Sequence, residues 1–372
     1  MRWPHCKLAS RRRSLRSVRK TLPPLPVSTA PADTAPASTT PPLDALSEVL
    51  RTVTLTGATF FSAEFQAPWG FTSPPSRALV TPLDADAHLV LFHLVLEGQA
   101  LARLEGSGDV SVKAGDIITF PQGHAHRMWQ GQPPRWYDTE PLVRRALAGS
   151  FEVERTAGPG DRTRFVCGYF RCDSFVGDVI LAGLPPLLTI SVRDDERRSW
   201  LEEAILFLAA EATSDHAGRS ALLTKLSEAL FVETLRRWMA RLPPDQIGWL
   251  AGARDAVVGL ALARLHREPA RKWSVETLAH EVGASRSTLM DRFARYLGEP
   301  PMAYLARWRL RLGARLLKTS RHSVLEIATR VGYESEAAFN RAFRRQYGAP
   351  PGRYRRTIGA ATTPRRSKSA RA

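Results

Sequence analysis

The last third of the chain contains two copies of one pattern, and this repeat restricts the possible folds more than any other feature of the sequence. In each copy a Ser-Val pair is followed by an Ala and then by a Val-Gly pair, beginning at Ser274 and again 49 residues later at Ser323. After the glycine the offset becomes 50 residues. A unit duplicated in this way predicts two similar supersecondary structures within one domain. The further matching positions are Ser285, Leu289, Phe293, Gly298, Pro300, Pro301 and Tyr304 in the first copy, and Ser335, Phe339, Phe343, Gly348, Pro350, Pro351 and Tyr354 in the second.

Each copy predicts a helix-turn-helix unit. A short helix leads to a glycine-containing turn, a serine is placed to cap the next helix, and the apolar side chains of that helix recur four residues apart. Gly298 and Gly348 end the second helices, because glycine readily adopts the left-handed conformation that follows a helix, and prolines then prevent continuation. Between the copies, Met302–Leu317 contains no helix breaker. It predicts a helix of about 24 Å, which could hold two recognition helices about 34 Å apart, one turn of DNA.

The distribution of charge indicates what the repeated unit binds. The 372 residues carry a net charge of +17, and 46 of the 53 basic residues are arginine. Residues 253–372 hold 25 basic and 9 acidic side chains, whereas residues 43–252 hold 20 basic and 26 acidic ones. Because arginine is a bidentate donor suited to phosphate, the basic C-terminal third predicts a polyanionic partner.

The sequence disfavours a membrane protein and a secreted protein. The sequence contains no uncharged apolar run of about 18 residues, the length that a transmembrane helix needs. Its three cysteines cannot form a disulfide framework, and no signal peptide is evident. We therefore expect a cytoplasmic protein without a membrane partner.

The two ends of the chain differ from the rest. Residues 1–42 hold an arginine cluster and a stretch rich in Pro, Ala, Ser and Thr, so we expect a disordered tail there. The arginine-rich start also resembles a mitochondrial transit peptide, but a misplaced start codon is the favoured alternative, since fold-like sequence begins at Leu43. Residues 358–372 are expected to form a second disordered basic tail.

Between the tails the sequence predicts an α+β architecture of three parts. Residues 43–192 alternate short apolar runs with Gly and Pro turns, which predicts a β-sandwich or barrel. Residues 193–252 contain two amphipathic helices and a linker that begins at Pro243-Pro244, and residues 253–357 form the all-α domain with the two helix-turn-helix units. The expected strands are Leu89–Leu96, Ala100–Leu104, Val110–Val112, Ile117–Phe120 and Arg164–Phe170, and the expected linking helices are Glu196–Ala212 and Ala217–Leu242.

The second linking helix carries a stripe of leucines. Leu222, Leu226, Leu230 and Leu235 lie on one side of the helix, with Arg236 and Arg237 opposite. An apolar stripe on a helix needs a partner, so the stripe predicts a homodimer. Packing of the same stripe against the chain's own barrel is the alternative.

Two parts of the chain resemble a known family. Pro300–Leu310 and Ile327–Arg355 are similar to the DNA-binding domain of AraC/XylS-type regulators, and the similarity extends over about residues 254–357. Residues 43–192 resemble the cupin sensor of one branch of that family, through Leu55–Gly57, Phe92–Gly98 and Ala114–Asp116. The resemblance implies a bacterial transcription regulator with two recognition helices per monomer, joined by a long helix.

The side chains that contact DNA are expected on the recognition helices, opposite their apolar faces. Arg286 is the first outward-facing residue of the first recognition helix, and Glu336 is that of the second. Arg295, Arg344 and Arg345 lie further along, where contacts to phosphate would position the protein without specifying sequence. The resemblance implies that the base-reading side chains are Ser287, Met290 and Asp291 in the first unit, and Ala337, Asn340 and Arg341 in the second.

Three of these side chains have a specific expected role. Arg341 suits bidentate contact with guanine O6 and N7, and Asn340 suits adenine. Asp291 carries the wrong charge for phosphate. It accepts a hydrogen bond from cytosine N4 or pairs with Arg295 one turn away, and the pairing is the favoured interpretation.

The sensor lacks most of a cupin metal site. Gly115–His126 fits the second cupin motif, but Leu91 stands where the first motif places its glutamate, and the motif's His-x-His pair is absent. We therefore expect no catalytic residue, no metal and no cofactor, and we expect Phe92, His93 and His126 to contact a small, mainly apolar or aromatic effector. His93 and His126 could still bind a metal together with Cys167, although buried histidines and a buried thiol are the favoured interpretation.

The sequence thus predicts a homodimeric regulator that binds double-stranded promoter DNA and responds to a small-molecule effector. RNA polymerase is a further candidate partner. The alternative is a cupin enzyme tethered to DNA, which a complete metal motif would have favoured. An architectural DNA binder without sequence preference is disfavoured, because the recognition helices carry mixed side chains such as Met290, Glu336 and Asn340.

Overall fold

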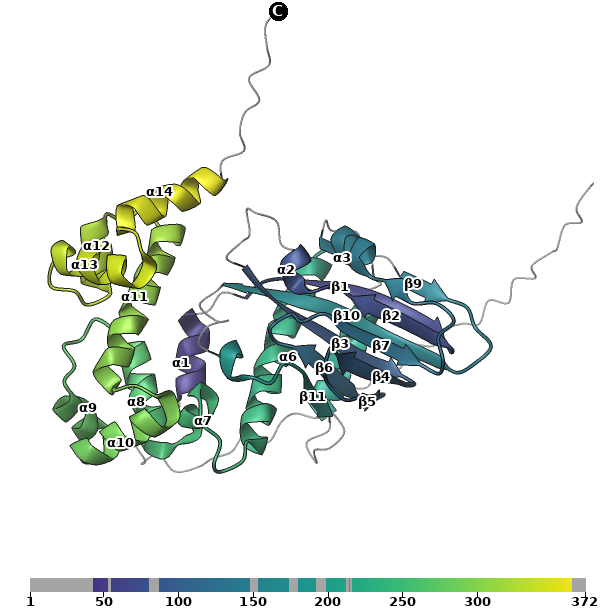
Figure 1. The fold of residues 1–372 in the computed structure, drawn as a ribbon, viewed down its shortest axis with the longest axis horizontal. Helices are drawn as coiled ribbons and strands as arrows, with labels where there is room; N and C mark the ends of the chain where they lie inside the picture. The colour runs from purple at the N-terminus through teal and green to yellow at the C-terminus, as the bar shows by residue number, and fades with distance from the viewer. Residues whose placement is uncertain are drawn as a thin grey trace, which may run out of the picture. The chain divides into compact units, whose positions relative to one another are not determined.

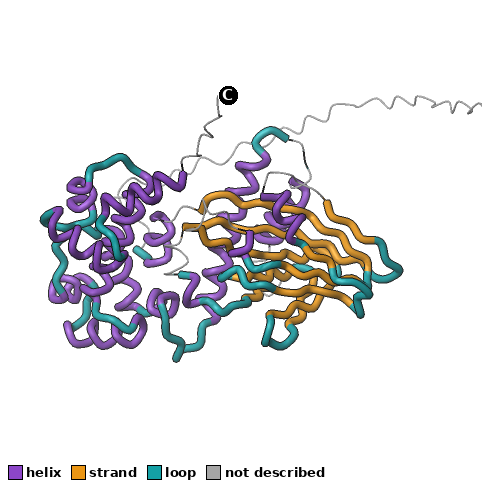
Figure 2. Tube along the Cα trace, turned by 45° about the horizontal axis from the view of Figure 1, so that its top comes forward, coloured by secondary structure: helices purple, strands orange, loops and turns teal. Residues whose placement is uncertain are grey.

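The structure, a computed structural model, describes residues 43–52, 55–79, 87–147, 153–173, 180–191, 199–211, 214 and 216–362. The predicted tail 1–42 and residues 363–372 of the second tail lie outside these ranges. Strands fill the first part of the described chain and helices the second (Figures 1 and 2). Among the described residues, no helix combines the length and apolar character needed to cross a membrane.

Two sheets make up the N-terminal domain. One has the strand order β11-β6-β3-β10-β1-β9 and the other the order β5-β4-β7-β2-β8. The pairs β1/β9 and β2/β8 are parallel, and the other pairings are antiparallel. The five predicted strands are confirmed as β3, β4, β5, β6 and β10. The strands are β1 Leu55–Gln66, β2 Trp69–Ser73, β3 Ala87–Glu97, β4 Gln99–Leu104, β5 Val110–Lys113, β6 Asp116–Phe120, β7 His126–Gln130, β8 Tyr137–Asp138, β9 Val153–Thr156, β10 Arg162–Asp173 and β11 Leu188–Ser191.

Strand β3 is buried on both faces. Leu89, Leu91 and Val95 lie in a core formed by side chains of both sheets. Val90, Phe92 and Leu94 belong to a second core on the opposite face of the strand. Because neighbouring residues of a strand point to opposite faces, Val90, Phe92 and Leu94 require a cover on the outer side of their sheet.

Helix α6, Arg219–Arg241, contributes to that cover. Its Leu230 and Leu235 are buried, and its Phe231 ring lies 5.4 Å from the Phe170 ring of β10. Helix α5, Ser199–Glu211, packs beside α6. The chain's own sheet therefore covers most of the leucine stripe, as in the second interpretation above, and the stripe does not by itself indicate a dimer.

In the described chain, three short helical segments lie between strands of the N-terminal domain. These are α2 Ser76–Leu79, α3 Glu140–Leu147 and a 3₁₀ turn at Leu181–Gly183. Helix α1, Ala45–Thr52, precedes β1 and packs against α8 of the helical domain. Its buried Ala45, Leu46 and Val49 belong to the same core cluster as residues of α8.

The C-terminal domain has the predicted pair of helix-turn-helix units. The first consists of α9 and α10, the second of α12 and α13, and α11 joins them. Two features differ from the expectation: α7 lies partly in the predicted linker, and α14 runs five residues past the predicted end of the domain at residue 357. The helices are α7 Trp249–Arg254, α8 Ala256–Arg267, α9 Val275–Glu281, α10 Arg286–Leu297, α11 Pro301–Thr319, α12 Val324–Arg330, α13 Glu336–Tyr347 and α14 Pro351–Thr362.

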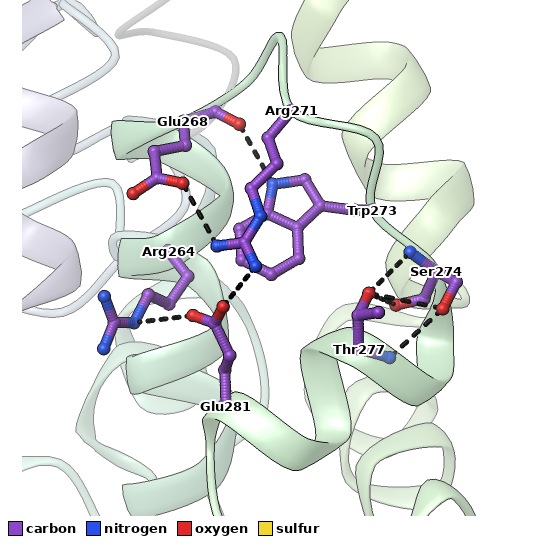
Figure 3. A network of polar contacts seen from close by, with 7 residues as sticks. All are labelled: Arg264, Glu268, Arg271, Trp273, Ser274, Thr277 and Glu281. Carbon is purple, nitrogen blue, oxygen red and sulfur yellow. Dashed lines mark hydrogen bonds and ion pairs between the residues drawn. The ribbon is translucent and has the colours of Figure 1, made fainter.

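A polar network fixes α9 against α8 (Figure 3). Arg271, in the loop between the helices, pairs with Glu268 at the end of α8 and with Glu281 at the end of α9. Its guanidinium lies over the Trp273 ring, 4.0 Å from the centroid. Ser274 caps α9 by accepting a hydrogen bond from Thr277 N, and Thr277 Oγ1 accepts one from the main-chain nitrogen of Ser274. The first unit thus begins at a loop whose side chains join the end of α8 to α9.

Candidate DNA-binding surface and sensor cavity

The two recognition helices, α10 and α13, begin and end in the same way. Ser285 Oγ accepts a hydrogen bond from Thr288 N at 3.1 Å, and Ser335 Oγ accepts one from Ala338 N at 3.2 Å. Gly298 and Gly348 follow the helices with φ values of 70° and 73°, in the left-handed region where a side chain is strained. The predicted serine caps and glycine stops are confirmed.

Both recognition helices bury one face and present the other. Leu289, Phe293, Phe339 and Phe343 are fully buried, as their spacing predicted. The candidate DNA-contacting residues all lie outside the core. Those that are exposed are Arg286, Ser287, Asp291, Arg295, Glu336, Ala337, Arg341, Arg344 and Arg345, and those that are half-buried are Met290 and Asn340.

The favoured interpretation of Asp291 was wrong. No ion pair joins it to Arg295 in the described part of the chain, and Arg295 instead lies over the Tyr296 ring, 5.4 Å from its centroid. An exposed cation that can stack on an aromatic face gains little from an exposed carboxylate one turn away. The Asp291 carboxylate therefore remains available on the outward face of α10.

The charged residues on the outward faces of α10 and α13 differ in their ion-pair partners. Arg286 of α10 pairs with Glu276 of α9 at 3.1 Å, with both side chains exposed. In the described structure no acidic side chain pairs with Arg341, Arg344 or Arg345 of α13. Helix α13 thus presents three unpaired cations to a polyanion, whereas α10 presents a free carboxylate.

Gly313 and Arg309, both in α11, hold α13 and the loop before α9 in place. Neither residue was singled out from the sequence alone. A Cβ on Gly313 of α11 would lie 2.8 Å from the Phe339 ring, so glycine is required for this close approach. Arg309 of α11 donates to the main-chain oxygens of Pro269 and Arg271 at 2.7 and 2.8 Å. A glycine within a predicted helix was the one available signal for the first contact.

A cavity of about 230 Å³ lies in the N-terminal domain. Residues of β1, β2, β3, β9 and β10 line it, together with the segment from Tyr137 into α3. Most of the lining is apolar, including Phe65, Phe71 and Leu142. A space of this size and character suits one small organic molecule.

The candidate ligand-binding residues do not all reach this cavity. His93 lines it, as does Cys167 of β10. Phe92 does not, because it points to the opposite face of β3 and stacks on Phe170 with the ring centroids 4.8 Å apart. His126 contacts the cavity only through His93, and it borders a separate surface pocket near Arg103 and Ala125. The alternation of side chains along a strand already places Phe92 and His93 on opposite faces of β3, so the two could not both reach one cavity.

Three buried side chains form a series beside the cavity. His93 Nδ1 lies 2.8 Å from Cys167 Sγ, and His93 Nε2 lies 2.8 Å from His126 Nε2. His126 Nδ1 lies 3.1 Å from the main-chain oxygen of His124. Since Cys167 and His126 contact opposite sides of the His93 ring, the three groups do not surround a common point, and they do not have the arrangement of a metal chelate.

Comparison with known proteins agrees with this architecture. A family model described as a cupin matches residues 44–240, and one described as a helix-turn-helix domain matches residues 278–357. The transcriptional regulator AlkR of Acinetobacter baylyi is 30% identical over 84% of this chain and 99% of its own length. An AraC-like transcription regulator of Streptomyces lividans is 38% identical over 72% and 87%, and the regulator MtrA of Neisseria gonorrhoeae is 29% identical over 72% and 87%. The chain therefore belongs to the AraC-type family of DNA-binding transcription regulators, in the group that carries an N-terminal cupin domain.

Proposed function

We propose that this regulator responds to a small, mainly apolar molecule that binds in the sensor cavity and changes its affinity for promoter DNA. The observation that carries the proposal is a mainly apolar cavity of about 230 Å³ in the same chain as two recognition helices with exposed outward faces. The relatives that match most of the chain are named as transcription regulators, which supports a regulatory and not an enzymatic role in the cytoplasm.

DNA contact is assigned to the outward faces of α10 and α13. Arg341 and Asn340 lie next to each other on α13, where they suit guanine and adenine, respectively. Arg344 and Arg345 follow about one turn later and suit phosphate, as does Arg295 at the end of α10. Ser287, Met290 and Asp291 of α10 suit direct contact with bases.

A continuous path of packed elements connects the cavity to the DNA-binding domain. Strand β1 lines the cavity through Ala63 and Phe65. Two residues separate β1 from α1, whose buried Leu46 and Val49 belong to the same core as Val258 and Leu262 of α8. A ligand that shifts β1 would therefore act on α8 through α1, and any effect requires different ligand affinity in the two states.

Titration with candidate ligands tests this proposal. An effector should shift the affinity of the full-length protein for its promoter by about 5- to 150-fold. Leu142→Phe, which fills the cavity from α3, should abolish the shift and leave the DNA affinity of the free protein unchanged. Leu230→Phe is the matched control, since Leu230 of α6 packs against the outer face of the sheet and does not line this cavity. A ligand that binds the cavity tightly without changing DNA affinity would not be the effector.

We further propose that the protein is a homodimer, with α5 in the interface. Trp200 and Phe207 lie seven residues apart on one side of α5, and both are 45% exposed. Leu222, near the start of α6, is 40% exposed. Large apolar side chains gathered on a helix surface mark interaction sites, and a symmetric dimer buries the same patch on both copies.

Sedimentation equilibrium tests this interface. Phe207→Glu should convert the dimer into a folded monomer, because two buried carboxylates would face each other across the symmetry axis. Ile247→Glu is the control, since Ile247 is also exposed but lies between α6 and α7. If the Phe207→Glu protein is folded and keeps the wild-type mass, α5 is not the interface.

A further inference from the structure

The series Cys167, His93 and His126 has the organisation of an activated nucleophile. A thiol lies within hydrogen-bond distance of an imidazole, and a third group contacts the far nitrogen of that imidazole. All three side chains are at least nine-tenths buried. The thiol and His93 both line the sensor cavity. No such arrangement is needed to fill a core, because an apolar side chain would pack there without polar groups to satisfy.

The proton positions follow from the one group that can only accept. The main-chain oxygen of His124 accepts from His126 Nδ1, so His126 Nε2 carries a lone pair in the neutral ring. His93 Nε2 must then donate to His126 Nε2, which leaves His93 Nδ1 as an acceptor. The Cys167 thiol donates to that nitrogen. Each group of the series is satisfied in a neutral state.

Burial favours this neutral state. It raises the pKa of the Cys167 thiol and lowers the pKa of both histidines, that of His126 to about 4. A buried neutral thiol does not react by itself. Its reactivity depends on the adjacent base and on a molecule that can enter the cavity, so the site would select its reaction partner by shape and polarity.

We propose that Cys167 captures an electrophilic ligand, an α,β-unsaturated carbonyl compound, in the sensor cavity, with His93 as the base and His126 orienting His93. The proposal rests on the proposed function, since it specifies the class of molecule that the cavity binds. The apolar lining suits the hydrocarbon part of such a ligand. Thr156 Oγ1, on the same cavity, is buried and has no hydrogen-bond partner in the described structure, so it can donate to the ligand's carbonyl oxygen.

The reaction balances without a further reactant. The Sγ–H bond breaks as its proton moves to His93 Nδ1, and the sulfur forms a bond to the β-carbon of the ligand. The π electrons of the C=C bond move to the carbonyl oxygen as an enolate. His126 accepts the hydrogen bond of the charged His93 ring and stabilises it. The proton on Nδ1 then passes to the α-carbon, which leaves a neutral thioether and restores the base.

Cys172 provides a control within the same strand. It lies five residues after Cys167 and belongs to the core on the opposite face of the sheet. Its Sγ donates to the main-chain oxygen of His88 at 3.4 Å. Both thiols are buried, but Cys167 lies beside the His93 imidazole and lines the cavity, whereas Cys172 is not among the residues that line it.

The experiment compares 2-cyclohexen-1-one with cyclohexanone, which has nearly the same shape but no reactive double bond. Full-length protein carrying Cys6→Ser is treated with each compound, and the modified cysteine is identified by peptide mass spectrometry. We expect an enone adduct on Cys167 that forms about 100-fold faster than one on Cys172, the size of effect that a positioned base provides. His93→Gln should slow the reaction at Cys167 by a similar factor, and Cys167→Ser should remove the adduct.

Equal rates at the two cysteines, or an unchanged rate in folded His93→Gln protein, would overturn the proposal. The comparison of Cys167 with Cys172 needs no substitution in the series, so equal rates would overturn the proposal even if His93→Gln does not fold. Thermal stabilisation by cyclohexanone tests ligand binding in the cavity separately from the covalent reaction. If cyclohexanone stabilises the protein but the enone does not react, the cavity binds ligands and only the covalent step is wrong. If neither compound binds or reacts, the sensor proposal fails for this class as well.

Discussion

Replacing Arg341 by alanine should weaken promoter binding by about 1 to 3 kcal/mol and relax the preference at one base pair. Arg341 is exposed at the centre of the outward face of α13, and no acidic side chain of the described chain pairs with it. Its guanidinium is therefore free to form two parallel hydrogen bonds to guanine O6 and N7. Affinity should be measured against a panel of operators that differ at single positions, at several salt concentrations.

Two variants serve as controls for Arg341. Arg344→Ala should weaken binding to all operators alike and reduce the salt dependence by about one counterion, because a phosphate contact carries no sequence information. Asp291→Ala changes the position in α10 that is equivalent to Arg341. It should relax the preference for cytosine at one base pair without a general loss of affinity, since it removes a negative charge near phosphate. A uniform loss across the panel for Arg341→Ala would show that this face of α13 has been assigned wrongly.

The helix-turn-helix units were predictable because their determinants are local. Caps, glycine stops and apolar residues four apart, such as Phe339 and Phe343, act within one helix and its turn. Because the unit is duplicated, each buried position can be identified in two copies. The apolar residue Leu289 in the first copy matches the apolar residue Phe339 in the second. The same reasoning predicted the long α11 to within two residues at its C-terminal end.

Contacts between distant segments were not predictable in this way. The stripe on α6 has the same pattern whether a sheet or a second copy covers it, and only the position of Phe231 beside Phe170 distinguishes the two. The residues before α8 were interpreted as a linker, yet Trp249 of α7 is buried and donates to Tyr304 of α11 at 2.9 Å. The series through His93 joins residues 33 and 74 positions away in the chain, and no local pattern indicates it.

The helical domain should lose stability in acid because of one buried histidine. His266 of α8 is 3% exposed, lies between aromatic rings and has its centroid 3.9 Å from that of Trp308. Its Nε2 is 2.7 Å from Tyr304 Oη, which also accepts from Trp249. If Tyr304 donates to Nε2, the remaining proton of the neutral ring is on Nδ1, which is buried and without a hydrogen-bond partner in the described structure. Protonation would add charge to a site that cannot solvate it.

Burial lowers the pKa of His266 to about 3, whereas an unfolded chain has a histidine pKa near 6.5. The unfolded state therefore binds more protons between these values, so the contribution is complete above pH 6.5 and decreases as the pH falls. From pH 6.5 to pH 4.5 this group alone should reduce the free energy of unfolding by roughly 2 to 3 kcal/mol. Urea unfolding followed by tryptophan fluorescence measures the effect, since Trp308 stacks on the ring.

Two variants isolate this contribution from those of the other titrating groups. His266→Gln keeps an acceptor for Tyr304 but does not titrate, so it should be less stable than wild type at pH 7 and lose stability less steeply in acid. His280→Gln is the control, because His280 is exposed on α9 in the same domain and should leave the slope unchanged. His93 and His126, whose pKa values burial also lowers, remain in both variants and contribute equally. A slope for His266→Gln equal to that of wild type would mean that water or a nearby carboxylate reaches His266 and stabilises its charge, contrary to the aromatic enclosure described here.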